Sequence, residues 1–337
     1  MNELDEPAAN LATDAFHQLE PNALLDAIDS TGHRTDGRFS ALNSYENRVY
    51  SVGLEDGSWL VSKFYRPGRW SDDAILEEHA FCRRLAEYEL PVIAPLADAH
   101  GETLFRQGPY RFCLFERVGG RAPELDSDAQ LELIGRTVAR LHAVAEHHPF
   151  HHRPSLSVAR LGDASAGFLL ESPLLPEHHV DVYASLVDEL LPMVDERLEH
   201  LDDLDILSLH GDLHPGNLLL AADGTPMLLD FDDTMTGPAI QDLWMFLSGE
   251  RDYAEARLAA LLDGYLEFRD FDLAELDLVE PLRTLRIIHY AAWIGRRWDD
   301  PAFRQAFPFF DSERFWDEHI LSLREQMAML EEAPLAY

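Results

Sequence analysis

The first third of the chain is built from short runs in which polar and apolar residues alternate, the pattern of half-buried strands. Asp56-Gly57 lies between two of these runs and is a strong signal for a hairpin turn. A second pair of runs flanks the turn-like segment Gln107-Gly108-Pro109. We predict four strands in this part of the chain: 43–54, 59–65, 103–105 and 110–115.

One helix interrupts these strands. Ser71 is a good N-cap, and Asp72 and Asp73 place negative charge in the first turn of a helix predicted over 72–88. After Gly119-Gly120 the apolar period changes to that of helices. We predict helices over 126–145, 180–201, from 239, 252–269, 272–297 and 312–330, with strand-like fragments at 207–209 and 227–229.

This order of elements predicts an α+β protein with two lobes. We expect an acidic N-terminal extension over 1–20, a small strand-rich N-lobe over 21–118, and a larger helical C-lobe over 119–337. The glycine pair 119–120 is the expected hinge, and the length of 337 residues is itself typical of more than one lobe.

The charge balance excludes some classes of partner. The chain carries 27 Lys and Arg against 62 Asp and Glu, a formal charge of −35. Nucleic acids and anionic membranes are bound by clustered positive charge, so we expect neither as a partner. The acidity fits either adaptation to high salt or a codon bias that favours Arg over Lys. Only one of the 27 cations is a lysine, Lys63.

Other features of the sequence predict a cytoplasmic protein, and we expect it to be a monomer. Hydrophobic residues make up 46% of the chain, which is enough to form cores. Cys82 and Cys113 are the only cysteines, too few for a disulfide framework. The first 20 residues contain five acids and no Lys or Arg, unlike a signal peptide, and no apolar run is long enough to span a membrane.

Three segments together carry the chemistry. Asp212 and Asn217 are five residues apart in a tight loop after an apolar strand, and Asp230 ends a second apolar strand. Lys63 lies on a predicted strand, 15 residues before Glu78 on the predicted helix. Phosphoryl transfer from ATP requires a carboxylate for the attacking hydroxyl, an amide and a carboxylate for Mg²⁺, and a lysine positioned by a glutamate. The sequence therefore predicts Asp212 and Asp230 as catalytic, Asn217 and Asp230 as metal ligands, and ATP and Mg²⁺ as cofactors.

Each of these segments has a simpler interpretation. A carboxylate at a strand end is often only a turn former, and Asp232 and Asp233 could be solvated. The spacing of His210, Asp212 and His214 resembles that of a metal-binding cluster. A hydrolytic metal site would need a further set of strong ligands, and none is obvious in the sequence. Glu77 competes with Glu78 for the lysine, and we favour Glu78 because it shares the helix face of Phe81 and Leu85.

The loop expected to bind phosphate differs from that of protein kinases. It spans 43–48 and has no glycine. Its backbone amides and the side chains of Ser44, Asn47 and Arg48 are the candidate donors, and the alternative is a plain turn. Glu116 and Val118, directly before the glycine pair, complete the residues that we assign to nucleotide binding.

Several strings resemble one bacterial family. The resemblance runs from about residue 20 to the end of the chain and includes 296–298 and 300–303. The strings that carry the resemblance are Leu42–Tyr50, Lys63–Pro67, Leu209–Asp212 and Gly237–Trp244. They resemble the stress response kinase A family (the YihE/RdoA type), which belongs with the aminoglycoside phosphotransferases and choline kinases.

The resemblance implies a two-lobed, protein-kinase-like fold in a cytoplasmic enzyme, with nucleotide bound by the N-lobe over 21–118 and the catalytic loop and substrate site in the C-lobe. It implies that the enzyme phosphorylates Ser or Thr in proteins, autophosphorylates and protects against stress. It implies that Asp212 accepts the proton, that Asn217 and Asp230 bind Mg²⁺, that Ser44 lies at the ATP site and that Lys63 and Glu78 anchor phosphate. It also implies that Asp242 steadies the catalytic loop. The first rival is a small-molecule kinase for an amino alcohol, aminoglycoside or sugar, in which Trp244, Trp293 and Trp298 could cage a cation. The second is a nucleotide-binding pseudokinase, which the intact set of motif residues disfavours.

Overall fold

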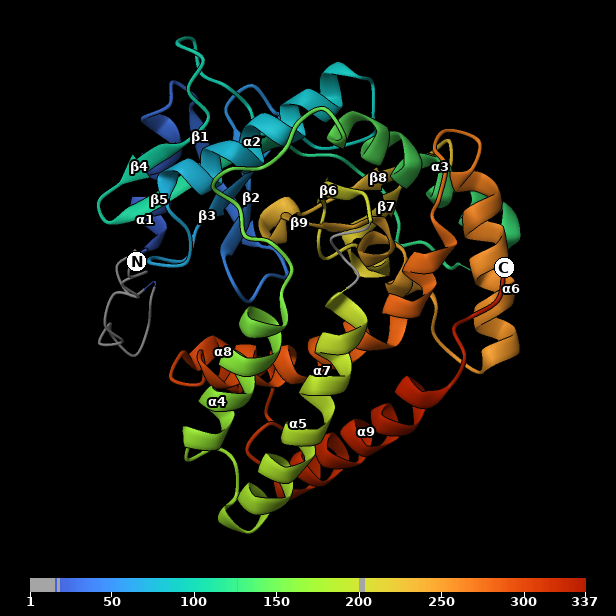
Figure 1. The fold of residues 1–337 in the computed structure, drawn as a ribbon. Helices are drawn as coiled ribbons and strands as arrows, with labels where there is room; N and C mark the ends of the chain where they lie inside the picture. The colour runs from blue at the N-terminus through green and yellow to red at the C-terminus, as the bar shows by residue number, and fades with distance from the viewer. Residues whose placement is uncertain (1–15, 17–18, 126, 200–203) are drawn as a thin grey trace. The chain divides into compact units, whose positions relative to one another are not determined.

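A computed structural model of the chain describes residue 16 and residues 19–125, 127–199 and 204–337, and these form two compact units (Figure 1). The acidic extension predicted over 1–20 lies largely outside the described residues. Unit 1 comprises the chain up to Arg83 together with Ile93–Val118 and Trp298–Ala306. Unit 2 comprises Arg84–Val92, Gly119–Arg297 and Phe307–Tyr337. Each unit therefore includes segments that are far apart in the sequence.

Unit 1 is built on a five-stranded antiparallel sheet with the order β1-β2-β3-β5-β4. Its strands are β1 (Thr35–Ala41), β2 (Arg48–Leu54), β3 (Trp59–Phe64), β4 (Phe105–Gln107) and β5 (Tyr110–Glu116). Gly57 has a φ of +86° in the β2–β3 turn, as the Asp56-Gly57 signal predicts. Strand β4 begins where the prediction over 103–105 ends.

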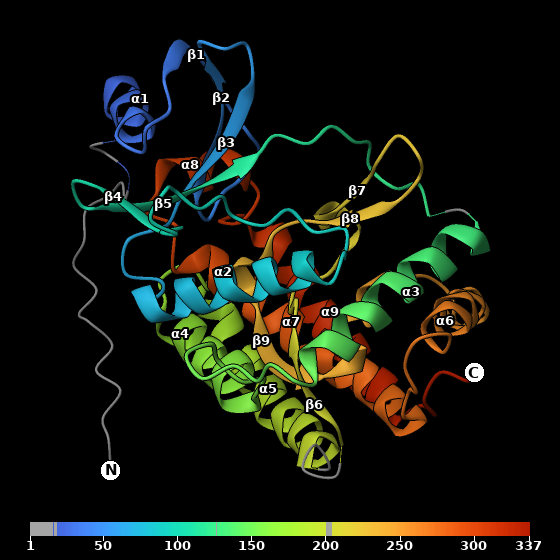
Figure 2. The same cartoon turned by 90° about the horizontal axis from the view of Figure 1, so that it is seen from above.

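Three elements of unit 1 were not predicted, and one of them is helix α8 (Pro301–Ala306), which lies between the helices predicted over 272–297 and 312–330. Strand β1 is an edge strand with almost every residue exposed, so its sequence has no buried face to reveal it. Helix α1 (Pro21–Asp29) is short and buries Leu24, Ala27 and Ile28 in the apolar core on one side of the sheet, close to β1 (Figure 2).

The helix predicted after Ser71 is confirmed as α2 (Asp72–Glu87), and the Ser71 hydroxyl accepts a hydrogen bond from the Ala74 amide. Ile75 of α2 packs with Tyr65 and Cys113 in a second, smaller cluster. The sheet of unit 1 is therefore covered by apolar contacts that hold its central strand β3.

Unit 2 is mainly helical. Its helices are α3 (Asp128–Ala145), α4 (Ala164–Glu171), α5 (Glu177–Leu198), α6 (Arg251–Tyr265), α7 (Val279–Gly295) and α9 (Glu313–Glu331), whereas α8 (Pro301–Ala306) belongs to unit 1. Helices α3 and α6 lie side by side (Figures 1 and 2). A Cβ at Gly135 or Gly264 would lie 2.0 Å from a backbone oxygen of the other helix, so this crossing requires glycine.

Two short antiparallel pairs carry the loops of unit 2. Strand β6 (Ile206–Leu209) pairs with β9 (Met235–Pro238), and β7 (Leu218–Leu220) pairs with β8 (Pro226–Leu228). The strands predicted at 207–209 and 227–229 are β6 and β8. Together with the sheet of unit 1 and the helices of unit 2, they confirm the α+β fold class.

The helix predicted from residue 239 is wrong. The chain there forms two short 3-10 turns, Ala239–Asp242 and Trp244–Phe246. The Ile240 amide bonds the Glu275 carboxylate instead of a helical carbonyl. The helix predicted over 272–297 is divided into a 3-10 turn (Leu273–Leu278) and α7. No helix in the described part of the chain is long and apolar enough to cross a membrane.

Candidate active site

In unit 2, the loop after β6 is held by a buried carboxylate. Asp242 accepts hydrogen bonds from the His210 amide through Oδ2 and from the Gly211 amide through Oδ1, both at 2.8 Å. The Gln241 side chain donates to the Gly211 carbonyl at 2.7 Å. Gly211 has a φ of +86°, and a Cβ there would lie 2.2 Å from the Asp233 carbonyl oxygen. These contacts fix the backbone directly before Asp212.

The end of β8 lies beside the same loop. The His210 ring donates from Nε2 to the Leu229 carbonyl at 2.6 Å, and the Leu229 amide donates to the Asn217 carbonyl at 2.9 Å. Leu229 directly precedes Asp230 in the chain. The structure thus brings Asp212, Asn217 and Asp230, from two of the three sequence segments, into one neighbourhood of unit 2. The third segment, with Lys63 and Glu78, lies in unit 1.

Asp212 is a half-buried carboxylate beside two basic side chains. Its Oδ1 lies 2.5 Å from Arg286 Nη1, and its Oδ2 lies 3.6 Å from His214 Nε2. Burial alone would raise the pKa of Asp212, but the contact with His214 and the charge of Arg286 outweigh it and hold the pKa well below its ordinary value. The carboxylate is therefore ionised at neutral pH and able to orient a hydroxyl.

Asn217 and Asp230 carry an amide oxygen and a carboxylate, the kinds of oxygen atom that Mg²⁺ prefers as ligands. Asn217 donates from Nδ2 to the Asp212 carbonyl at 2.9 Å, which directs its amide oxygen away from that bond. Asp230 is exposed and has a φ of +37°, a left-handed conformation that is uncommon outside glycine and typical of functional sites. An amide oxygen and a carboxylate fit a Mg²⁺ ion whose other ligands are water and phosphate.

The alternative metal cluster finds no support. Within the described ranges there is no group of three or more His, Cys, Asp and Glu side chains that could hold a metal ion. His210 is fully buried, and its ring contacts Phe231 at 4.5 Å between centroids. Asp232 is also buried, so the interpretation of Asp232 as a solvated residue is wrong.

In unit 1, the lysine and the glutamate are in contact. Lys63 lies on β3 with 4% of its surface exposed, and its Nζ lies 3.4 Å from Glu78 Oε1 on α2. The ammonium also lies 5.0 Å from the centre of the Tyr65 ring. Glu78 is the residue that the apolar face of the helix favoured over Glu77.

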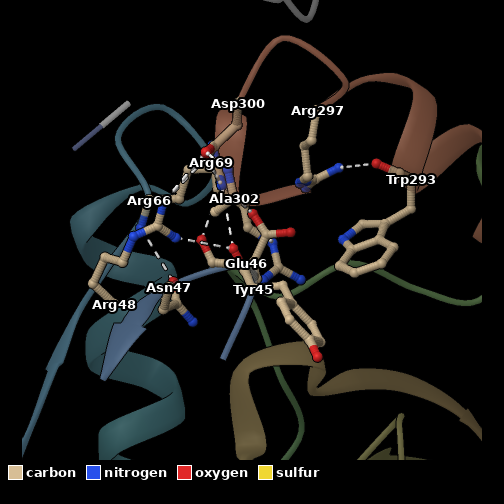
Figure 3. Close-up of polar contacts among 10 residues, drawn as sticks. All are labelled: Tyr45, Glu46, Asn47, Arg48, Arg66, Arg69, Trp293, Arg297, Asp300 and Ala302. Carbon is tan, nitrogen blue, oxygen red and sulfur yellow. Dashed lines mark hydrogen bonds and ion pairs between the residues drawn. The ribbon is translucent and has the colours of Figure 1, made fainter. Parts of the chain in front are cut away.

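The loop before β2 is tied to the segment that follows α7 in sequence (Figure 3). Arg66 Nη2 lies 2.8 Å from Asp300 Oδ2, and Arg48 Nη2 lies 3.3 Å from the same carboxylate. Asn47 is 2% exposed and accepts a hydrogen bond from the Arg66 amide. Burial would raise the pKa of Asp300, but the hydrogen bond from Arg66 and the charge of Arg48 lower it.

Of the three side chains predicted to donate to phosphate, two, Asn47 and Arg48, form hydrogen bonds within the protein. Arg48 and Asn47 bond to protein groups of unit 1, and Ser44 lines a cavity of about 230 Å³ bounded by residues 41–50 and α8. Glu116 ends β5 and Val118 is half-buried just after it. The roles of these residues in nucleotide binding stay predictions.

Several residues of the site were missed from the sequence. His142 on α3 lies 3.2 Å from Asp242 and contacts the Tyr265 hydroxyl, and Arg153 donates to the carbonyls of Asp232 and Thr234. A histidine on the apolar face of α3 was the only signal for His142. Arg286 is 74 positions from Asp212, so no local pattern could have linked them.

The comparisons with known proteins show the family and the fold of the chain. The chain matches the phosphotransferase enzyme family over residues 38–279, and it belongs to that family. Its relatives include stress response kinase A of Escherichia coli O157:H7, which is 41% identical over 320 residues that cover 95% of this chain and 96% of the relative. The serine/threonine protein kinase RdoA of Salmonella typhimurium strain LT2 is equally similar, at 41% over 95% of this chain and 96% of its own. The resemblance to the stress response kinase A family is thus confirmed.

A solved structure confirms the fold at lower sequence identity. Amicoumacin kinase hAmiN, in complex with AMP-PNP, Ca²⁺ and its ligand, superposes with a TM-score of 0.70. The match covers 95% of this chain and 97% of the other, at 18% identity. That likeness shows the kinase-like phosphotransferase fold.

Proposed function

We propose that this phosphotransferase is an ATP- and Mg²⁺-dependent kinase that transfers the γ-phosphate to Ser or Thr of proteins, including itself, in a cytoplasmic stress response. The observation that carries the proposal is the clamped loop of unit 2, in which Asp242 holds the backbone before Asp212 and the amide of Asn217 bonds the Asp212 carbonyl. A rigid loop of this kind positions an attacking hydroxyl, which is most of what a kinase contributes to phosphoryl transfer.

Each residue has a distinct part in the proposal. Asp212 orients the hydroxyl of the acceptor and takes its proton late, because a carboxylate with a lowered pKa is a weak base. Asn217 and Asp230 would hold Mg²⁺, which neutralises phosphate charge. In unit 1, Lys63 would bind the α- and β-phosphates with Glu78 as its partner.

The choice of a protein acceptor is supported by the curated relatives. RdoA, at 41% identity over nearly the whole chain, is named a serine/threonine protein kinase. The amicoumacin kinase is named for a small molecule, but at 18% identity it supports the fold only. Transfer to a small hydroxyl compound is therefore the alternative that the experiment must exclude.

The test is a radiolabelled transfer assay with [γ-³²P]ATP and Mg²⁺ on generic protein substrates, choline and aminoglycosides. We expect label in Ser and Thr of protein, and a loss of about 10³-fold in turnover in Asp212→Ala with ATP binding retained. Asp195→Ala, an exposed aspartate of α5, is the matched control and should keep wild-type turnover. Wild-type turnover in Asp212→Ala, or label in small molecules alone, would contradict the proposal.

A further inference from the structure

Helix α7 of unit 2 contains more arginines than acidic residues, whereas acidic residues are in excess in the chain as a whole. It contains a single acid, Glu280, in a protein with 62 acids and 27 Lys and Arg. Glu280 Oε2 accepts a hydrogen bond from Arg283 Nε at 3.1 Å, and Arg283 Nη2 donates to the Leu247 carbonyl, so Nη1 is the nitrogen of Arg283 that the described contacts leave to a ligand. Residues spaced alternately three and four apart share one face of a helix. At that spacing, α7 and the residues just after it carry three arginines and two aromatic residues, which we call the α7 stripe: Arg283, Arg286, Tyr290, Trp293 and Arg297.

One residue of the α7 stripe, Arg286, contacts Asp212, the proposed proton acceptor. Arg286 donates to Asp212 through Nη1, yet its side chain is 41% exposed. Among the residues that the structure describes, Asp212 is the only hydrogen-bond partner of that guanidinium. A guanidinium has five donors, so Arg286 can bind Asp212 and an anionic group of the acceptor at the same time.

Each tryptophan that could bind a cationic ligand already has an arginine guanidinium beside its ring. In unit 2, the Arg283 guanidinium lies 5.4 Å from the centre of the Trp244 ring, and the Arg297 guanidinium lies 5.6 Å from Trp293. Arg297 also donates to the Trp293 carbonyl (Figure 3). In unit 1, Arg304 lies 5.9 Å from Trp298. A cationic acceptor would have to displace these arginines and would meet like charge.

The remaining surface of the stripe is aromatic. Tyr290 is exposed and stacks on Trp293 with ring centroids 5.7 Å apart, and both rings contact the edge of Phe307. Exposed aromatic residues interleaved with arginine are typical of surfaces that bind polypeptide chains. This stripe therefore differs from the closed, charged pocket of a small polar ligand.

We propose that the α7 stripe selects the acceptor, and that the acceptor is a Ser or Thr within an acidic polypeptide segment, whose carboxylates bind Arg286 and Arg283. This inference rests on the proposed function and adds the substrate class. The net charge of −35 opposes such a substrate at long range, but at physiological salt the screening length is about 8 Å. Contacts within hydrogen-bond distance of the stripe are therefore the stronger effect.

The experiment compares two peptides that share one Ser and differ only in flanking residues, Asp and Glu in one and Arg in the other. We expect the wild-type protein to phosphorylate the acidic peptide with a kcat/KM at least about tenfold higher, the size of one charged hydrogen bond. Arg286→Gln and Arg283→Gln should each lower this ratio about fivefold or more, and Arg286→Lys should restore part of it. Arg314→Gln, an exposed arginine of α9, is the matched control and should leave the ratio unchanged.

The ratio separates selection from structural damage, because a misplaced Asp212 would lower transfer to both peptides equally. Equal use of the two peptides, preference for the basic one, or an unchanged ratio in both Gln variants would overturn the role of the stripe while leaving a protein kinase. Transfer to small molecules alone, or to no acceptor with ATP still bound, would overturn the proposed function and this inference with it.

Discussion

Lys63 is the residue of unit 1 to which the proposed function assigns phosphate binding. It occupies the central strand β3, opposite Val49 of β2 and Cys113 of β5, and it is almost completely buried. A buried ammonium is costly unless it is paired, and Glu78 supplies the pair. The same compact charge is suited to a phosphate, whereas a guanidinium is larger and planar.

The substitution Lys63→Arg should therefore lower the kinase activity, although it keeps the positive charge. The longer side chain has no room at a site with 4% exposure, and its fork geometry would displace Glu78. We expect a fall of at least about 100-fold in kcat/KM for ATP, measured by steady-state kinetics, with the secondary structure intact by circular dichroism. Unchanged kinetics would mean that the single lysine of the chain has no part in the reaction.

Among the elements, the 3-10 turn at Ala239–Asp242 is the one whose side chains bond the loop directly before Asp212. It carries Gln241 and Asp242, and it is itself held by Glu275, whose Oε2 accepts a hydrogen bond from the Ile240 amide at 2.7 Å. Glu275 is 1% exposed, and burial raises its pKa to about 7 although that hydrogen bond lowers it. We therefore expect the stability of this turn to depend on pH in the neutral range.

The sign of this effect follows from proton binding. Between the unfolded pKa of about 4.5 and the folded pKa of about 7, the folded state binds the proton and the unfolded state does not. The contribution of Glu275 to the free energy of unfolding is therefore complete below the unfolded pKa of about 4.5. It is lost as the pH rises from there to the folded pKa of about 7.

Glu275→Gln should remove this pH dependence while keeping the acceptor oxygen. From pH 5 to pH 8 we expect the variant to gain on the order of 2–3 kcal/mol in unfolding free energy relative to the wild type, measured by urea denaturation. Glu196→Gln, an exposed glutamate of α5, is the control and should follow the wild-type curve. Parallel curves for Glu275→Gln and the wild type would show that Glu275 is ionised throughout.

At the scale of the whole molecule, the excess of negative charge is the dominant feature. Even if every Lys and Arg were paired, 35 carboxylates would have no such partner. Exposed pairs such as Arg136–Glu267 and Arg251–Glu255 contribute little each. The folded state is compact and therefore suffers more from repulsion among its carboxylates than the unfolded chain does.

Potassium chloride should consequently stabilise the protein. We expect the thermal midpoint to rise as KCl increases, with most of the gain below about 0.5 M, because the screening length falls from about 10 Å at 0.1 M to about 3 Å at 1 M. Differential scanning calorimetry over this range measures it. A midpoint that does not respond to KCl would mean that repulsion among surface carboxylates contributes no measurable instability, and the codon-bias interpretation of the acidity would then be favoured.

The sequence by itself determined the elements with a clear apolar period and the motif residues with short spacings. Helix α2, strands β3 and β5, and the order of Lys63, Asp212, Asn217 and Asp230 are of this kind, because spacing along the chain fixes which side chains share a face or a loop. Strand β1 and the 3-10 turn at Ala239–Asp242 were not predictable, since contacts elsewhere in the chain decide their conformation.

Only the tertiary structure decided which partners the charged side chains have. Arg286 contacts Asp212 across 74 positions, and Arg48 contacts Asp300 across 252. Local spacing contains no information about such pairs, because an arginine can bond any carboxylate that packing brings within reach. The motifs in the sequence therefore predicted a phosphotransferase, and the arginines that packing places beside Asp212 and along α7 carry the inference about its acceptor.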